Sequence, residues 1–299
     1  MASQGLARGH TSMLRALITA ALVLCTGAQP AQVKVERTAA KNSDRVAASE
    51  YQPSPDFDNQ AEQQLLEFAN QARARVGAPP LHLDDGLTAA ARAHADVMAR
   101  QKELTHQFDG EPSLPRRLAA SSPLHLDRAG ENVALDLTAE QAHEHLMHSP
   151  PHRENLLDPS YNVAGIGVIR SGGRLFVVQD FGHSLPAYTA DQMQDTIASA
   201  VLRMRQAARL PVLERRSDTA LQNAVCSMAQ EDRLGTRAMH DLAQQYYVVS
   251  YTNMHPEVLP DAAARLVTDR RLRSVAVSAC YARTATYPSG VYWVGLLFY

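Results

Sequence analysis

Three short motifs decide the fold of this 299-residue chain, and they are Gly130-Glu131-Asn132, Ser149-Pro150-Pro151-His152-Arg153-Glu154-Asn155 and Gln179-Asp180-Phe181-Gly182. Together with His106 upstream, they bring two imidazoles and a carboxylate into a segment of ordinary domain size. No common rule of secondary structure requires this set of residues. The motifs therefore indicate a particular fold with a polar site inside it.

Two helices are predicted before the first motif. Asn59 and Glu62 form a candidate capping pair for the first helix, which Gly77-Ala78-Pro79-Pro80 ends. The second helix follows Asp84-Asp85. Its apolar stripe includes His94, which this position assigns to the core as a hydrogen-bonded residue rather than a ligand.

Between the first two helices and the last motif the predicted structure is less regular. The chain from His106 to Leu137 is rich in Pro, Ser and Gly and predicts mostly loop around a short helix near Leu118. Residues 138–147 predict a third helix, and Ser149 is the expected N-cap of a short helical turn.

A β-hairpin is predicted around the last motif. Its strands are Val163 to Ile169 and Leu175 to Phe181, and Ser171-Gly172-Gly173 joins them. Helices first and paired strands afterwards imply the α+β class.

The second half of the sequence resembles the first half in reduced form. The segment from Gly290 to Phe298 has the length and apolar character of that from Gly173 to Phe181. Thr252-Asn253 falls where the Glu-Asn pair of the first motif would repeat, so the polar site is absent from this half. We expect a degenerate copy of the first domain, and the alternative is a chance similarity of two short hairpins.

In this order and spacing, the three motifs and His106 resemble the CAP superfamily in its bacterial branch. This superfamily is also called SCP or the cysteine-rich secretory, antigen 5 and pathogenesis-related-1 proteins, and the resemblance covers residues 60–182 well. It implies a three-layer α-β-α sandwich in residues 58–186, and the internal similarity places the degenerate copy in residues 190–299. It also implies that His106, Glu131 and His152 line an open cleft.

What this cleft binds is left open by the sequence. Two neutral imidazoles can hold a divalent cation, Zn²⁺ or Ca²⁺/Mg²⁺, while a carboxylate neutralises charge or orients a ring. Ser149 stands where animal members of the family have a second Glu, so the full two-His, two-Glu set is absent. The alternative is a polar clamp without metal, in which Asn132 and Asn155 tie down backbone groups. The family resemblance suggests a small apolar ligand, a cell-envelope component or a protein partner.

A hydrolase is the competing class of protein. Ser149, His152 and Glu131 have the residue types of a nucleophile, a base and an orienting carboxylate. Against this, we expect backbone donors at the helix start to occupy the Ser149 hydroxyl, and the chain has no Gly-X-Ser-X-Gly elbow. We therefore favour a binding protein over an enzyme.

Composition and the N-terminal segment bear on partners and location. The formal net charge of −2 leaves no overall positive field for phosphates, so nucleic acid is not an expected partner, and residues 269–273 are interpreted as a solvated helix end. Residues 1–31 resemble a cleaved export signal and 32–57 a flexible linker. No later segment is long and apolar enough to span a bilayer. We expect a secreted or periplasmic protein. Two further hypotheses are a lipoprotein anchored at Cys25 and a true start at Met13.

Two cysteines remain after the export signal. An oxidising compartment favours a disulfide between Cys226 and Cys280, which would stabilise the fold by about 4 kcal/mol in the chain-entropy model. The alternative is a pair of buried free thiols.

Overall fold

The structure, a computed structural model, describes residues 56–299. The export signal and most of the linker predicted from the sequence lie outside these residues. Phe57, which the sequence places at the end of the linker, forms an isolated antiparallel bridge with Ile169. Every helix within residues 56–299 is too short or too polar to cross a membrane.

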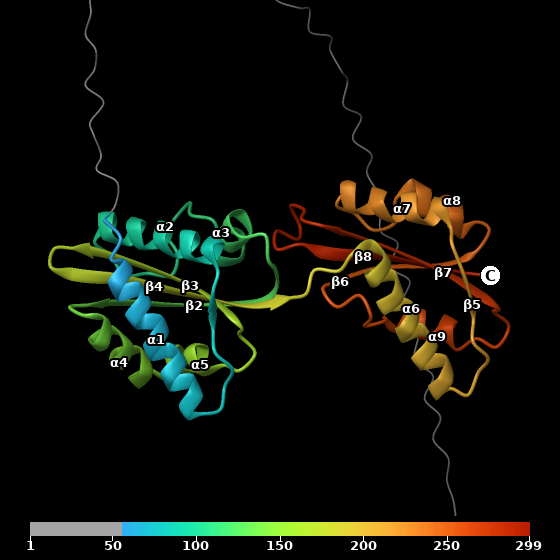
Figure 1. Ribbon diagram of the computed structural model, residues 1–299. Coiled ribbons are helices and arrows are strands. Elements are labelled where there is room, and N and C mark those ends of the chain that lie inside the picture. Colours follow the sequence, from blue (N-terminus) through green and yellow to red (C-terminus); the bar gives the residue numbers. More distant parts are fainter. Residues whose placement is uncertain (1–55) are drawn as a thin grey trace, which may run out of the picture. The chain divides into compact units, whose positions relative to one another are not determined.

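The first half is the predicted α+β sandwich of three layers (Figure 1). Its sheet has the order β1-β3-β4-β2, with β1 parallel to β3 and the other neighbours antiparallel. Helices α2 and α3 cover one face, and α1, α4 and α5 cover the other. The elements are α1 (Asn59–Arg75), β1 (His82–Leu83), α2 (Asp85–Gln101), α3 (Leu114–Ser121), β2 (His125–Asp136), α4 (Ala139–His148), α5 (Pro150–Leu157), β3 (Val163–Ser171) and β4 (Arg174–Leu185).

The helix α2 lies unusually close to the sheet because β3 presents glycine beneath it. A Cβ atom added to Gly165 would lie 2.1 Å from the carbonyl carbon of Leu87, and one on Gly167 would lie 2.3 Å from the backbone nitrogen of Arg92. Ala90 and Ala91 on the buried side of α2 allow the same close approach. The predicted stripe of α2, with His94 within it, is therefore the core face.

The strand β2 was not predicted, and the expectation of mostly loop up to Leu137 is wrong. β2 pairs with β4 along nearly its whole length, from His125 opposite Leu185 to Asp136 opposite Leu175. Its sequence lacks apolar alternation because it is an edge strand whose middle carries Gly130, Glu131 and Asn132. The polar residues that hide the strand in the sequence are those that build the site.

The N-terminus of α1 also differs from the expected capping pair. Asp58, not Asn59, is the N-cap, and its carboxylate accepts a hydrogen bond from the Ala61 amide at 3.0 Å. Glu62 turns into the sheet instead, where its Oε1 accepts from the Val168 amide at 3.1 Å.

Replacing Asp58 by Ala is expected to lower the free energy of unfolding by about 1 kcal/mol, whereas Asn should largely preserve it. The Ala61 amide, and then Arg170, hold the pKa of Asp58 below its usual value of 3.8. The stabilisation is therefore present above that value and lost as the pH falls through the lowered pKa. Urea denaturation at several pH values measures this. An equal Asp58→Ala effect at pH 7 and pH 2 would contradict the assignment.

The second half, described by itself, has a sheet of the same order and strand directions, β5-β7-β8-β6 with β5 parallel to β7. Helices α6 and α9 cover one face, and α7 and α8 cover the other (Figure 1). The elements are α6 (Ala190–Ala207), β5 (Glu214–Arg216), α7 (Thr219–Gln230), α8 (Arg237–Ala243), β6 (Tyr247–Asn253), α9 (Asp261–Val267), β7 (Ser274–Ala282) and β8 (Val291–Phe298).

The register of β6 corrects the position expected for the lost polar pair. In the first half, Glu131 pairs with Asp180, the residue before Phe181. In the second half, Val248 pairs with Leu297, the residue before Phe298. Val248 and Val249, rather than Thr252 and Asn253, thus stand where Glu131 and Asn132 stand in the first half. The corresponding positions of the second half therefore carry two apolar side chains rather than Thr and Asn.

A buried arginine occupies the same place in both halves. Arg73 in α1 and Arg205 in α6 are 0 % and 1 % exposed, and each donates hydrogen bonds to backbone carbonyls of the turn after its own helix and of one distant segment. The acceptors are Pro79, Leu156, Asp158 and Tyr161 for Arg73, and Pro211, Val267 and Asp269 for Arg205.

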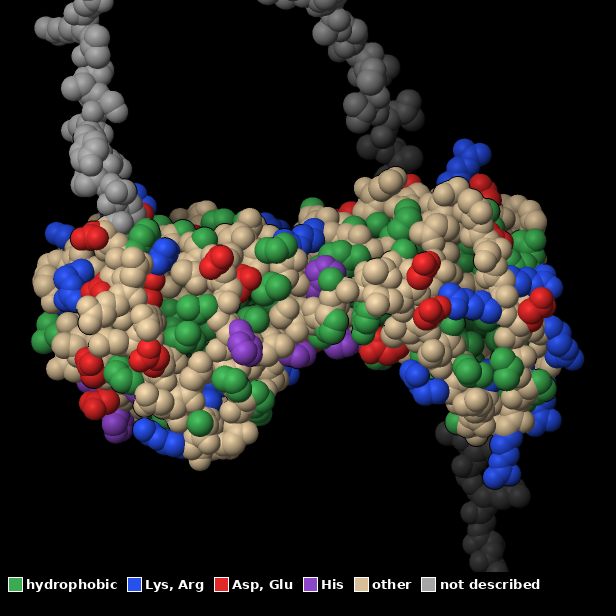
Figure 2. Space-filling view, in the orientation of Figure 1, with side chains coloured by type: hydrophobic (Ala, Val, Ile, Leu, Met, Phe, Trp, Pro, Cys, Tyr) green, Lys and Arg blue, Asp and Glu red, His purple; other side chains and the backbone are tan. Residues whose placement is uncertain are grey.

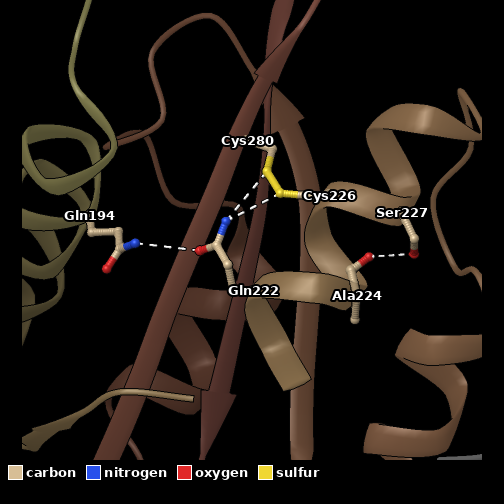
Figure 3. Close-up of a disulfide and its surroundings, with 6 residues drawn as sticks. All are labelled: Gln194, Gln222, Ala224, Cys226, Ser227 and Cys280. Atoms are coloured by element: carbon tan, nitrogen blue, oxygen red, sulfur yellow. Dashed lines mark hydrogen bonds between the residues drawn. A yellow bond between two sulfur atoms is a disulfide. The ribbon is translucent and has the colours of Figure 1, made fainter. Parts of the chain in front are cut away.

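The predicted disulfide between Cys226 and Cys280 is present and joins α7 to β7 (Figure 3). The Gln222 side-chain amide lies 3.2 Å and 3.4 Å from the two sulfur atoms. The alternative of two free thiols is therefore not the arrangement in this structure.

Candidate functional site

The residues singled out in the sequence meet at the edge strand β2, between the two helical layers of the first half. Glu131 and Asn132 are neighbours on this strand, so their side chains point to opposite faces of the sheet. His106 comes from the loop after α2, and His152 comes from α5 on the other face. The two imidazole rings lie side by side, with centroids 6.3 Å apart and an interplanar angle of 29°.

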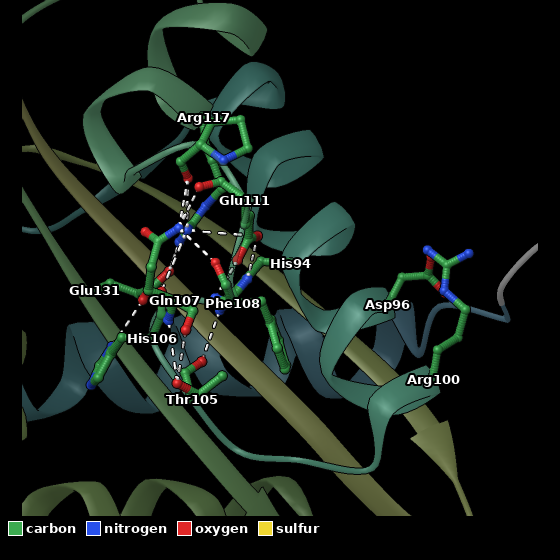
Figure 4. Close-up of polar contacts among 11 residues, drawn as sticks. His94, Asp96, Arg100, Thr105, His106, Gln107, Phe108, Glu111, Arg117 and Glu131 are labelled. Atoms are coloured by element: carbon green, nitrogen blue, oxygen red, sulfur yellow. Dashed lines mark hydrogen bonds and ion pairs between the residues drawn. The ribbon is translucent and has the colours of Figure 1, made fainter.

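Glu131 holds His106 in place. Its Oε1 lies 2.8 Å from Nδ1 of His106, and its Oε2 accepts from the Arg117 guanidinium (Figure 4). Glu131 is only 7 % exposed, whereas the His106 side chain is 56 % exposed. In a neutral His106 ring the carboxylate favours the proton on Nδ1, which places the lone pair on the outward Nε2.

His152 is supported by a hydroxyl rather than a carboxylate. Its Nδ1 lies 2.8 Å from Oγ of Ser149, three residues earlier. Burial, and then repulsion by the His106 ring whenever that ring is protonated, lower the pKa of His152. The ring is therefore neutral over a wider pH range than an exposed imidazole.

Ser149 holds the N-cap position of α5, but the expectation that backbone donors occupy its hydroxyl is wrong. The hydroxyl makes no capping bond within the described residues. Pro150 and Pro151 fill the first helical positions and have no N–H to donate. The hydroxyl is thereby left for the His152 ring.

Two asparagines connect β2 to α5. Asn132 donates to the His152 carbonyl at 3.0 Å. Asn155 donates to the Glu131 carbonyl at 3.2 Å and to the Asn132 side-chain oxygen at 3.1 Å. These bonds fix the spacing between Glu131 and His152.

A buried polar chain that the sequence analysis did not single out extends the site toward α2. Arg117, on α3, lies between Glu131 and Glu111, 3.6 Å from the latter (Figure 4). Glu111 in turn lies 2.7 Å from Nδ1 of the fully buried His94, whose Nε2 lies 2.9 Å from the Thr105 carbonyl. His94 is thus the hydrogen-bonded core residue expected from the sequence, and it pins the loop one residue before His106.

Asp180 is a second residue whose role the sequence did not indicate. It is fully buried opposite Glu131, and neither carboxyl oxygen has a hydrogen-bond partner within residues 56–299. Burial, and then the negative charge of Glu131, raise the pKa of Asp180 well above its usual value. The motif that contains Asp180 marks its position, but nothing in the pattern distinguishes it from an exposed strand carboxylate.

These contacts limit the chemistry of the site. Both oxygens of Glu131 are engaged, so Glu131 orients His106, and the imidazoles of His106 and His152 supply the available lone pairs. No group of three or more His, Cys, Asp or Glu side chains in residues 56–299 is arranged to hold a metal ion. Ser149 and His152 are in contact, but Glu131 contacts His106, so the three do not form a serial triad.

The sandwich that carries the histidine-carboxylate site is also the part of the chain that matches a known protein family. Residues 66–181 match the family model described as the cysteine-rich secretory protein family, CAP. The match is confined to this segment, which is therefore similar to CAP domains in sequence.

Individual relatives are distant. The chain is 29 % identical over 153 residues to the uncharacterized protein YkwD of Bacillus subtilis, covering 48 % of this chain and 59 % of that protein. It is 31 % identical over 113 residues to the uncharacterized membrane protein YlbC of the same organism, covering 37 % and 32 %. The chain thus spans less than two thirds of each relative.

Among solved structures, an extracellular protein with an SCP domain from Bacillus anthracis is 27 % identical. The match has a TM-score of 0.39 and covers 42 % of this chain and 41 % of that one.

Proposed function

We propose that this protein is an exported binding module whose CAP domain binds through the imidazole pair His106 and His152. The observation that carries the proposal is that each imidazole ring is held by a contact to its inner nitrogen, Nδ1. Each Nδ1 has a partner, Glu131 or Ser149, while neither Nε2 has one among the described residues.

A divalent cation fits this donor set. Neutral imidazoles with carboxylate or hydroxyl support on the second nitrogen are typical metal ligands, and borderline-soft Zn²⁺ suits nitrogen better than Ca²⁺ or Mg²⁺ does. His106 and His152 would hold the ion, and Glu131 and Ser149 would keep their rings oriented. The bound ion would supply Lewis acidity or a bridging charge for a ligand. With two protein ligands, we expect modest affinity.

The ligand itself is proposed from the family resemblance as a small apolar molecule, a cell-envelope component or a protein partner. Export is supported by the N-terminal sequence pattern and the disulfide. We further propose that residues 190–299 are a degenerate copy of the same fold, which is supported by the equal strand order and by the paired arginines Arg73 and Arg205.

Calorimetric titration of Zn²⁺, Ca²⁺ and Mg²⁺ into chelator-treated protein tests the cation site. We expect Zn²⁺ to bind most tightly, and His106→Ala and His152→Ala each to weaken it at least about tenfold. His145→Ala is the matched control, because this exposed histidine pairs with Asp136 on another part of the domain. Absence of heat with any cation, or an equal loss in His145→Ala, would reject the site and leave the polar clamp.

A hydrolase is the second candidate, and the 2.8 Å contact between Ser149 and His152 favours it. Glu131 does not orient His152, which is the weakness of this candidate. Activity on a panel of peptides and esters that disappears in Ser149→Ala, but survives in a matched Ser160→Ala variant, would establish it over the binding role.

A further inference from the structure

Charge is distributed unevenly along the chain, although its formal sum is only −2. Residues 58–186 contain 11 basic and 17 acidic side chains, whereas residues 190–299 contain 12 arginines and 10 acidic side chains. Within the second half the arginines concentrate in residues 203–216 and 265–273. These two segments contain nine arginines and two carboxylates.

The fold brings these two segments together. Arg205 near the end of α6 donates at 2.9 Å to the carbonyls of Val267 and Asp269, and the Glu214 amide donates at 2.9 Å to the Arg273 carbonyl. Eight of the nine arginines are exposed, and only Arg205 is buried. In Figure 2, blue side chains gather over the end of this half where α6 and α9 finish. We call this surface the arginine end.

Acidic neighbours neutralise only part of the arginine end. Ion pairs join Arg215 to Asp195, Arg216 to Glu214 and Arg271 to Asp269. The other exposed arginines form no ion pair within residues 56–299, and they are Arg203, Arg209, Arg265, Arg270 and Arg273. The surface therefore keeps a strong positive field at any pH, because guanidinium does not lose its proton in proteins.

An apolar cavity of 370 Å³ opens beside these arginines. Its walls include Leu202, Val212 and Leu213, and Arg205 and Arg215 also line it. Val212 is 64 % exposed, which is unusual for a valine among charged residues.

In the first half, the position equivalent to Leu202 carries a polar side chain that makes hydrogen bonds instead. Asn70, three residues before Arg73, binds both the amide and the carbonyl of Leu81 through its side chain. The residue three before Arg205 is Leu202, which cannot make these bonds and lines the cavity instead. A side chain that hydrogen-bonds the Leu81 backbone in the first half thus corresponds to an apolar side chain in the second.

We propose that the arginine end docks the protein onto the surface of an anionic phospholipid bilayer. The arginines would meet lipid phosphates, for which planar guanidinium groups are well shaped, and Val212 with the adjoining cavity would take apolar lipid groups. A soluble polyanion would use the charges but leave Val212 and the cavity in water. A mixture of exposed cationic and apolar groups matches a bilayer interface, where both are accommodated. This proposal does not depend on the imidazole pair.

Cosedimentation of the full chain with vesicles of phosphatidylcholine and phosphatidylglycerol tests the proposal, with pure phosphatidylcholine as the neutral surface. We expect binding to the anionic vesicles alone, weakening as salt is raised. Each arginine near such a surface contributes about fivefold. The triple variant Arg209→Gln, Arg265→Gln and Arg270→Gln should therefore lose roughly a hundredfold in affinity. Val212→Ser should lose about fivefold.

The matched control is the triple variant Arg116→Gln, Arg174→Gln and Arg237→Gln. It removes the same charge from exposed positions elsewhere, and its N-terminal sequence is identical to that of the other variants. Equal losses in the two triple variants would overturn the proposal. So would an unaffected Val212→Ser variant together with full displacement by a short DNA duplex, because a polyanion site would then explain the binding.

Discussion

Arg73→Met is expected to lower the free energy of unfolding by about 4 kcal/mol. The guanidinium donates to four backbone carbonyls, from the Pro79 turn and from the loop that leaves α5, at 2.7 to 2.9 Å. Methionine fills much of the same volume but offers these carbonyls no donor. Each loses roughly 1 kcal/mol of net hydrogen bonding.

Arg75→Met is the matched control, because Arg75 lies on the same helix two residues later and is exposed. We expect its effect to stay within about 0.5 kcal/mol. The measurement is urea denaturation followed by circular dichroism. Equal shifts in the two variants would show that the buried hydrogen bonds do not hold α1 to its loops.

The same substitution at Arg205 tests the equivalence of the two halves. Arg205 donates to three carbonyls, so Arg205→Met should cost about 3 kcal/mol. Trp293, the single tryptophan of the chain, is buried in β8, and its fluorescence reports the second half directly. A fluorescence midpoint that does not move in Arg205→Met would contradict this expectation.

Elements with one dominant signal could be predicted from the sequence. An apolar stripe predicted α2, and the paired glycines between apolar runs predicted the hairpin β3-β4. These signals are local, so they need no knowledge of the partner elements. The fold class followed from their order.

The rest depends on contacts between distant segments. β2 is a strand because β4 lies beside it, and its own residues favour loop. In the sequence, Arg73 and Arg205 look like ordinary arginines near the end of a helix. Only the folded segments that supply their backbone acceptors bury them. At the site, the sequence pattern singled out His106, Glu131 and His152. It did not indicate that Glu131 orients His106, because this role depends on Arg117, which lies in none of the motifs.

Glu131→Met is expected to destabilise the first half by about 3–5 kcal/mol. It removes the nearer of two carboxylates from the Arg117 guanidinium, whose side chain is 7 % exposed and which then keeps only Glu111 at 3.6 Å. Arg117→Met should cost a similar amount, because the charge of Glu131 then remains buried beside Asp180. Both losses follow from a buried charge that has lost its closest partner rather than from lost packing.

The double variant, Glu131→Met with Arg117→Met, should recover most of this stability. Replacement of a buried ion pair by apolar side chains of similar volume is often neutral or stabilising. The second half supports this expectation, since Val248 stands at the position of Glu131. Urea denaturation of the four proteins gives the coupling energy directly. Additive losses in the double variant would show that the two side chains stabilise the domain independently.

Recovery of the fold should not restore the site. Without the Glu131 carboxylate, Nδ1 of His106 has lost the partner that fixes its proton and its ring orientation. We expect the double variant to bind Zn²⁺ about 10-fold to 100-fold more weakly than the native chain at equal stability. This result would mean that the buried ion pair between Glu131 and Arg117 serves to orient the His106 imidazole rather than to stabilise the fold. Native affinity in a stable double variant would instead mean that the ring is held by the loop alone.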